Sequence, residues 1–212
     1  MNDLNKLLTR RKKFLGPNLP TFYDTPVHLV KGEDVWVWDK EGKKYLDCYN
    51  NVPHVGHCHP KVVEAITKQA STLNTHTRYL HEGILNYVEK LTNTFNHNLT
   101  TAIMTCTGSE ANDIALRMAQ KITGSYGIIS TDHTYHGNTA LVSQLSSTNP
   151  SNNKLFKYFK HIPAPDSYRP LGNGTNQEHS DIFALELEKS IMEFENEGMG
   201  FAGLIICPYF AN

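Results

Sequence analysis

The feature that most constrains this chain is residues 105–112, which read TCTGSEAN. A short apolar run, residues 102–104, precedes this stretch, and apolar residues follow it at helical spacing from position 114 to position 119. The pattern predicts a strand, a tight glycine turn and then a helix. Ser109 stands where the N-cap of that helix is expected, and Asn112 follows three positions later.

The first turn of such a helix is suited to bind an anion. Its backbone N–H groups lack intrahelical partners, and the helix dipole places about half a positive charge there. Gly108 removes the side chain that would keep an anion away from the backbone, and Thr107 and Ser109 add hydroxyl donors. These residues therefore predict a phosphate-binding turn built mostly from backbone. A plain, well-capped turn between a strand and a helix is the alternative interpretation of the same residues.

The turn differs from the two common nucleotide-binding loops. No Gly-Lys-Ser/Thr sequence closes it, so it is not a Walker A loop. It also lacks the three-glycine pattern of the dinucleotide-binding folds. An anion site of neither type suggests the monophosphate of a cofactor.

The composition argues against several classes of function. The 20 Lys+Arg against 21 Asp+Glu residues give no electrostatic case for binding nucleic acid or an anionic membrane. The four cysteines, at positions 48, 58, 106 and 207, are scattered, which favours reduced thiols over a disulfide framework. No signal peptide and no run of membrane-spanning length is found, so we expect a cytoplasmic protein.

The patterns along the chain suggest two segments. Residues 1–58 are predicted to form an N-terminal arm and a segment of a small domain. That segment begins with an amphipathic arm over residues 1–15 and continues as a small antiparallel piece, with strands predicted over residues 27–30, 35–38 and 43–48.

Residues 59–212 are predicted to form the N-terminal part of a large, incomplete domain. Helices are expected over residues 61–70, 83–95, 137–145 and 181–197. The last of them carries an apolar stripe, which consists of Phe183, Leu185, Leu187 and Ile191. Strands are expected over residues 126–130, 158–162 and 201–207. Strands that alternate with helices predict an α/β fold, with a mainly parallel sheet and helices on both faces. Ligands of such sheets bind at the carboxyl ends of the strands, where the predicted phosphate-binding turn also lies.

A polar loop precedes the first of these helices, and residues 54–60 read HVGHCHP. Three histidines and a cysteine suggest zinc, but their spacing is poor and no second ligand pair follows at a suitable distance. Pro60 suits the first position of a helix. We therefore prefer a polar loop that caps the helix, with a zinc site on His57, Cys58 and His59 as the alternative.

A second group of functional candidates follows the strand expected over residues 126–130. Tyr135 offers a flat ring for stacking on a heteroaromatic cofactor, and His136 can hydrogen-bond one of the cofactor's substituents. Gly137 opens the next helix. Taken alone, these residues are explained by a polar loop with one half-buried tyrosine. Beside the predicted phosphate-binding turn, they describe a pocket with one anion site and one aromatic surface.

The two motifs together, TGSEAN at residues 107–112 and YHG at residues 135–137, resemble those of the class III aminotransferases, which use pyridoxal 5′-phosphate. The sequences YLD at residues 45–47 and GHCHP at residues 56–60 also fit that family. Several segments are most similar to the branch that contains the ethanolamine-phosphate and phosphohydroxylysine phospho-lyases, together with bacterial relatives usually described as aminotransferases. These segments are residues 46–48, 50–52, 54–60, 77–81 and 165–169.

The resemblance implies a truncated fold-type I pyridoxal-phosphate enzyme, normally a homodimer with its active sites at the subunit interface. It implies that Gly108 and Ser109 bind the cofactor phosphate, with Thr107 nearby, and that Tyr135 stacks on the pyridine ring beside His136. Small-molecule amines or amino acids are the implied substrates. Three further residues fall in segments that approach the substrate in that family: Asn50, Asn51 and Arg78.

Two departures from the family pattern affect the interpretation. The lysine that binds the cofactor covalently and the aspartate that pairs with the pyridinium nitrogen lie beyond the point that matches Asn212. We therefore expect a fragment of a longer enzyme, because an open sheet cut after a buried strand would expose an apolar edge. In addition, the strand over residues 201–207 usually ends in an acidic residue before the proline, whereas here it ends in Cys207.

Transamination between an amine or amino acid and a keto acid or aldehyde is the predicted activity of the whole enzyme. Elimination of phosphate from a phosphorylated amine is the alternative within the same fold. A catalytically silent relative is the alternative from another class, and it is suggested by Cys207 and by the missing lysine. We name no catalytic residue in this chain and expect it to be inactive by itself.

Overall fold

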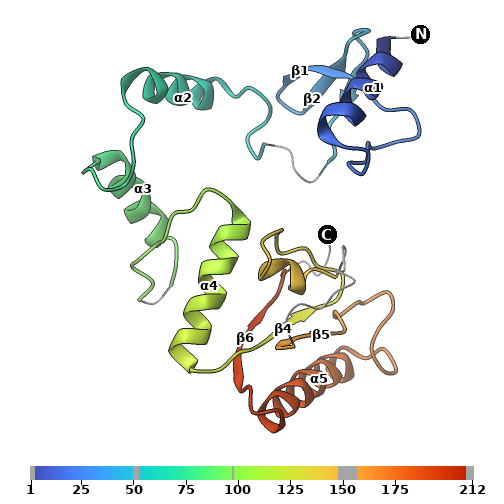
Figure 1. Cartoon of the computed structure of the whole chain (residues 1–212), viewed down its shortest axis with the longest axis vertical. Helices are drawn as coiled ribbons and strands as arrows, with labels where there is room; N and C mark the ends of the chain where they lie inside the picture. Colours follow the sequence, from blue (N-terminus) through green and yellow to red (C-terminus); the bar gives the residue numbers. More distant parts are fainter. Residues whose placement is uncertain (1–2, 50–52, 97, 148–156, 209–212) are drawn as a thin grey trace. The chain divides into compact units, whose positions relative to one another are not determined.

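The computed structural model of the chain describes residues 3–49, 53–96, 98–147 and 157–208 (Figure 1). The structure divides into two compact units, Met1–Glu82 and Gly83–Asn212. The division predicted at residue 58 concerns the domains of a complete enzyme, and it stays a prediction. Among the described residues, no helix combines the length and the apolar character that crossing a membrane requires.

The described part of the first unit begins with a helix and contains a small antiparallel sheet. Its elements, in chain order, are α1 (Asp3–Leu15), β1 (Leu29–Glu33), β2 (Trp36–Asp39), β3 (Lys44–Leu46) and α2 (Pro60–Thr72). The strands pair in the order β1-β2-β3, which confirms the predicted antiparallel piece. Asp39 closes the turn between β2 and β3, because its carboxylate accepts hydrogen bonds from Lys43 N at 2.8 Å and from Tyr45 Oη at 2.7 Å. Pro60 opens α2, as predicted.

Two helices follow, and from the second of them onward helical elements and strands alternate. They are α3 (Glu82–Thr92), α4 (Gly108–Thr123), β4 (Gly127–Thr131), the 3₁₀ turn η1 (Val142–Leu145), β5 (Phe159–Ile162), α5 (Asn176–Asn196) and β6 (Phe201–Ile205). β4 is the central strand of a three-stranded parallel sheet with the order β5-β4-β6. The parallel sheet confirms the α/β class.

Helices cover both faces of this sheet in the second unit, as the sequence predicts (Figure 1). α4 and η1 pack on one face, where the buried side chains are Leu116, Ile128, Val142, Leu145 and Phe159. α5 packs on the other face, where the buried side chains are Ile129, Ile162 and Phe194. Successive residues of β4, Ile128 and Ile129, therefore serve opposite faces, as the pleat of a strand requires.

The predicted strand over residues 102–104 is wrong, because the structure has no strand there and leaves Ile103 and Met104 exposed. An extended run becomes a strand only when a neighbour accepts and donates its ladder hydrogen bonds. No strand of the described sheets pairs with these residues.

The helix predicted over residues 137–145 is reduced to the single turn η1. Its first residues hydrogen-bond to α4 instead of to one another. Asn138 N donates to Ser109 Oγ at 3.0 Å, and Thr139 Oγ1 donates to Asp113 Oδ1 at 2.9 Å. These long-range bonds fix the path of residues 138 and 139, and periodicity in the sequence does not reveal them.

The helix α5 begins earlier than predicted, because Thr175 caps it and accepts a hydrogen bond from Glu178 N at 3.2 Å. The predicted apolar stripe is largely correct, since Phe183, Leu187 and Ile191 pack against the core. Leu185, which was assigned to the same stripe, is instead 60% exposed. Phe194 was overlooked although it extends the stripe by one turn.

We expect Phe194→Ala to lower the free energy of unfolding of the second unit by about 3–5 kcal/mol. Phe194 is fully buried, and its ring lies so close to Gly127 that a Cβ on that glycine would be 2.5 Å away. Leu185→Ala is the matched control on the same helix, and the loss there should stay below about 0.5 kcal/mol because the side chain is exposed. Urea unfolding followed by circular dichroism measures both, and equal losses would contradict this packing.

Candidate cofactor site

The N-terminus of α4 is closed by a reciprocal capping box. Thr107 is the N-cap, and its Oγ1 accepts a hydrogen bond from Glu110 N at 3.1 Å. In return, Glu110 Oε2 accepts from Cys106 N at 2.8 Å and from Thr107 N at 3.2 Å. The prediction that Ser109 is the N-cap is therefore wrong. The sequence carried the better signal, Thr-x-x-Glu before a helical run.

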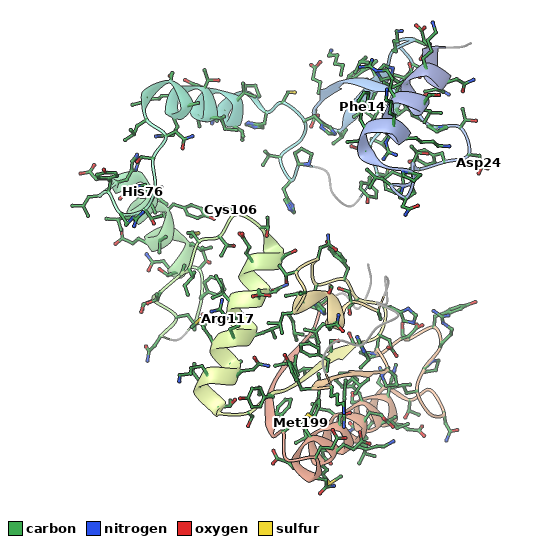
Figure 2. All side chains as sticks on the ribbon, viewed as in Figure 1. Phe14, Asp24, His76, Cys106, Arg117 and Met199 are labelled. Atoms are coloured by element: carbon green, nitrogen blue, oxygen red, sulfur yellow. The ribbon has the colours of Figure 1, made fainter. Side chains whose placement is uncertain are left out.

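This cap leaves several donors of the first turn available to a ligand. The amides of Gly108 and Ser109 are at the helix start, where no intrahelical acceptor exists. The hydroxyls of Thr107 and Ser109 each accept one hydrogen bond and keep their own proton for donation. Together with the helix dipole, these groups favour a bound anion. Figure 2 labels Cys106, which directly precedes this turn.

Gly108 meets no packing demand among the described residues. A Cβ built on it would find nothing within 4 Å, and its backbone is not in the left-handed region. The fold itself would therefore accept a larger residue at this position. A glycine that the fold does not require is explained by a ligand that approaches the backbone closely.

The second motif lies directly against this turn. Gly137 has a φ of 135°, and a Cβ at this position would come within 2.5 Å of Ser109 Oγ and 2.9 Å of Ser109 Cα. Ser109 Oγ also accepts the hydrogen bond from Asn138 N at 3.0 Å. The structure thus brings together the start of α4 and the loop that carries Tyr135 and His136.

The two side chains of that loop differ sharply in exposure. The Tyr135 ring is 45% exposed, and His136 is only 8% exposed. The backbone of His136 is held on both sides, because His136 N donates to Ser146 Oγ at 3.0 Å and His136 O accepts from Asn112 Nδ2 at 2.8 Å. The ring atom His136 Nε2 is buried and has no hydrogen-bond partner among the described residues. The loop therefore offers an accessible aromatic ring and, beside it, one unsatisfied imidazole nitrogen.

The surroundings of His136 disfavour a charged ring. Burial is the main cause that lowers the pKa of His136, and the nearby His161 of β5 lowers it further. His161 Nε2 is also buried and without a partner in the described part of the chain. The sequence alone gives no signal for His161, because a single histidine inside a short strand is uninformative before the register of the sheet is known.

The structure does not place the predicted substrate residues relative to this loop. Asn50 and Asn51 lie outside the described residues. Arg78 belongs to the first unit, where its side chain is exposed and its backbone N–H donates to His76 Nδ1 at 3.2 Å. The roles proposed for these three residues stay predictions.

The histidine-rich loop has a structural explanation within the first unit. His57 exchanges backbone hydrogen bonds with Asp34 at 3.0 and 2.7 Å, and its Nε2 lies 2.8 Å from Asp47 Oδ2. The hydrogen bond from His57 is the main cause that holds the pKa of the Asp47 carboxyl below its usual range. The ring of His57 lies over Gly32, where a Cβ would be 2.8 Å from His57 Cγ.

The zinc alternative finds no support in the part of the chain that the structure describes, where no three His, Cys, Asp or Glu side chains are grouped to hold a metal ion. The loop instead lines an open pocket of about 530 Å³ together with Asp34 and Tyr49. The pair of Asp47 and His57 was not identified from the sequence, because ten residues separate its members.

Comparison with known proteins identifies the family. The family model described as aminotransferase class-III matches residues 21–210, and the chain belongs to this family. The alanine–glyoxylate aminotransferase 2-like protein of Drosophila melanogaster is 34% identical over 204 residues, which cover 92% of this chain and 41% of that protein. The ethanolamine-phosphate phospho-lyase homolog 1 of Caenorhabditis elegans is 36% identical over 168 residues, which cover 77% of this chain and 36% of that protein.

Solved structures agree with the fold. A phospholyase from Arthrobacter in complex with phosphoethanolamine has a TM-score of 0.89 and 36% identity, with 96% of this chain and 48% of that chain covered. An (S)-enantioselective omega-transaminase from Thermomicrobium roseum has a TM-score of 0.73 and 26% identity, with 96% and 49% covered. The chain thus spans about half the length of these structures and about two fifths of the curated relatives. The family and fold predictions are confirmed.

We expect Gly108→Ala to weaken the binding of inorganic phosphate about ten-fold or more and to leave the fold intact, since the methyl group would obstruct an anion but no protein atom. Gly137→Ala is the contrasting variant, because its positive φ and its contact with Ser109 should cost about 1–3 kcal/mol of stability. Isothermal titration and urea unfolding separate the two effects. Unchanged phosphate binding in Gly108→Ala would rule out this role for the glycine.

We expect the stability of the second unit to fall as the pH drops from about 7 to about 5. The pKa of His136 is lower in the fold than the value of about 6.5 in an unfolded chain, so the unfolded state takes up its proton first. The stability that neutral His136 contributes is therefore present above that value and is lost below it. His136→Gln should flatten the pH dependence of the unfolding free energy.

The matched control is His133→Asn, at an exposed residue with a φ of 58°, where asparagine accepts the same backbone conformation. This variant should keep the slope of the wild-type chain. A slope that is unchanged in His136→Gln would show that other groups determine the pH dependence.

Proposed function

We propose that this chain is the cofactor-binding part of a pyridoxal-phosphate-dependent aminotransferase, which transfers an amino group between an amine or amino acid and a keto acid or aldehyde. The observation that carries the proposal is the contact between the first turn of α4 and the Tyr135–His136 loop, made through Ser109, Gly137 and Asn138. This contact joins the predicted anion site to an aromatic surface. Membership in the class III family indicates that pyridoxal phosphate is the ligand that both would bind.

The described residues fit pyridoxal phosphate. The amides of Gly108 and Ser109 and the hydroxyls of Ser109 and Thr107 would hold its phosphate. The exposed ring of Tyr135 would stack on its pyridine ring, and the unpartnered nitrogen of His136 would hydrogen-bond a ring substituent. When bound, the cofactor supplies the electron sink of the reaction, and the protein supplies orientation and electrostatics.

Elimination of phosphate from a phosphorylated amine is the second candidate activity. It is supported by the similarity to the Arthrobacter phospholyase and to the Caenorhabditis elegans phospho-lyase homolog. The predicted substrate residues Asn50, Asn51 and Arg78 would decide between the two activities, because the contacts to the cofactor serve both. Cys207 follows β6 at the carboxyl edge of the sheet, where strands β4 and β5 also end. Because the family usually has an acidic residue here, a reaction other than amino transfer is worth testing.

The assembly is a proposal from the same family membership, and the location is a proposal from the sequence, whose four scattered cysteines favour reduced thiols. We infer a homodimer, with the active sites at the subunit interface, and a cytoplasmic protein. Within the complete enzyme, residues 1–58 would belong to the arm and the small domain, and residues 59–212 to the large domain.

The decisive test uses the complete reading frame in which this chain occurs, loaded with pyridoxal phosphate. We expect formation of pyruvate and glycine from alanine and glyoxylate. Release of inorganic phosphate from phosphoethanolamine, with no keto acid consumed, would favour the phospho-lyase instead. Bound cofactor without either activity, across a panel of amine donors, would favour a silent relative and contradict both proposals.

A further inference from the structure

Three side chains of α4 hold the loop after His136, and the proposed function assigns a role to only one of them. All three bonds run from the first two turns of the helix to residues 136–139. They are Asn138 N to Ser109 Oγ at 3.0 Å, Asn112 Nδ2 to His136 O at 2.8 Å, and Thr139 Oγ1 to Asp113 Oδ1 at 2.9 Å. Positions 109, 112 and 113 share one face of a helix, so these bonds form a continuous attachment.

Asn112 has the most direct effect on the ring of His136. It is partly buried, and its amide is the donor that fixes the carbonyl of His136, while Ser146 fixes the N–H of the same residue. With both backbone groups held, the imidazole has little freedom apart from rotation of its own side chain. The position of His136 relative to the start of α4 therefore depends on Asn112.

We propose that Asn112 is a positioning residue, which sets the spacing between the phosphate-binding turn and the Tyr135–His136 surface. The inference rests on the proposed function and names a residue that touches neither the phosphate nor the ring of the ligand. A ligand with a phosphate and an aromatic ring gains affinity only when one geometry satisfies both contacts. Without the Asn112 bond the loop moves away from α4. The phosphate contact and the ring contact each still form, but one ligand no longer makes both at once.

The test compares a whole ligand with one of its parts. Pyridoxamine 5′-phosphate is the whole ligand, because its amine does not react with lysine side chains, and inorganic phosphate is the part. Asn112→Ala should bind pyridoxamine 5′-phosphate about five- to ten-fold more weakly, the worth of one hydrogen bond of about 1 kcal/mol or slightly more. Its affinity for inorganic phosphate should equal that of the wild type. Isothermal titration of the 212-residue chain measures both.

A matched control exists at the opposite end of the same helix. Gln120 Nε2 donates to Tyr126 O at 3.1 Å, which is also a bond from a side-chain amide to a backbone carbonyl. Gln120→Ala should leave both affinities unchanged. Thr139→Val provides a second variant, because it removes the bond to Asp113 with almost no change in shape and should reproduce the selective loss. Asn112→Gln, which keeps a donor, should restore part of the affinity.

The outcomes separate the inference from the proposed function. A wild-type chain that binds inorganic phosphate but shows no added affinity for pyridoxamine 5′-phosphate would contradict the proposed function itself. If the wild type shows that added affinity, an equal loss for both ligands in Asn112→Ala would mean a direct contact with phosphate and would overturn the inference. Unchanged binding of both would overturn it as well. If Asn112→Ala does not fold, Thr139→Val decides by the same criteria.

Discussion

The close contact between Gly137 and Ser109 is the constraint on which the candidate site depends. At this point the loop after β4 approaches the first turn of α4 so closely that no side chain fits between them, and the positive φ of Gly137 makes this path possible. Ser109 then serves two purposes, because its Oγ accepts from Asn138 N while its amide and its hydroxyl proton stay available to the proposed anion. The fold itself requires the glycine at position 137, whereas the glycine at position 108 is explained by the proposed ligand.

The parallel sheet holds the loop that makes this contact. All five residues of β4 are buried, and one polar side chain of the strand and one of the following loop make buried hydrogen bonds here. Ser130 Oγ donates to Leu145 O at 3.1 Å, and Thr134 Oγ1 donates to Thr131 O at 2.8 Å. These buried hydrogen bonds join the strand, the loop and η1, and bonds of this kind cost stability when one partner is removed. Because these hydrogen bonds hold the loop in place, the exposed Tyr135 keeps a defined position.

The sequence predicts the elements with strong local signals and misses those that depend on distant partners. Two motifs, at residues 107–112 and 135–137, were enough to predict the family, and the apolar spacing of α5 predicted most of its buried face. The strand at residues 102–104 failed because pairing requires a neighbour that local sequence does not name. The N-cap was misplaced because Thr107 and Ser109 both suit that position, and only the partner at Glu110 distinguishes them. His161 and Asn112 act across the fold, and no local pattern reveals such contacts.

Relatives with different activities match the chain equally well, and the distinction between cofactor contacts and substrate contacts explains why. The aminotransferase-like relative and the phospho-lyase homolog are 34% and 36% identical to it, although their names describe different reactions. The proposed site would hold the phosphate and the ring of the cofactor, and both reactions need these contacts. What separates amino transfer from phosphate elimination is the treatment of the substrate after the cofactor has withdrawn its electrons. Which of the two reactions takes place depends on substrate contacts, such as those predicted for Arg78. Similarity at the cofactor contacts therefore does not distinguish them.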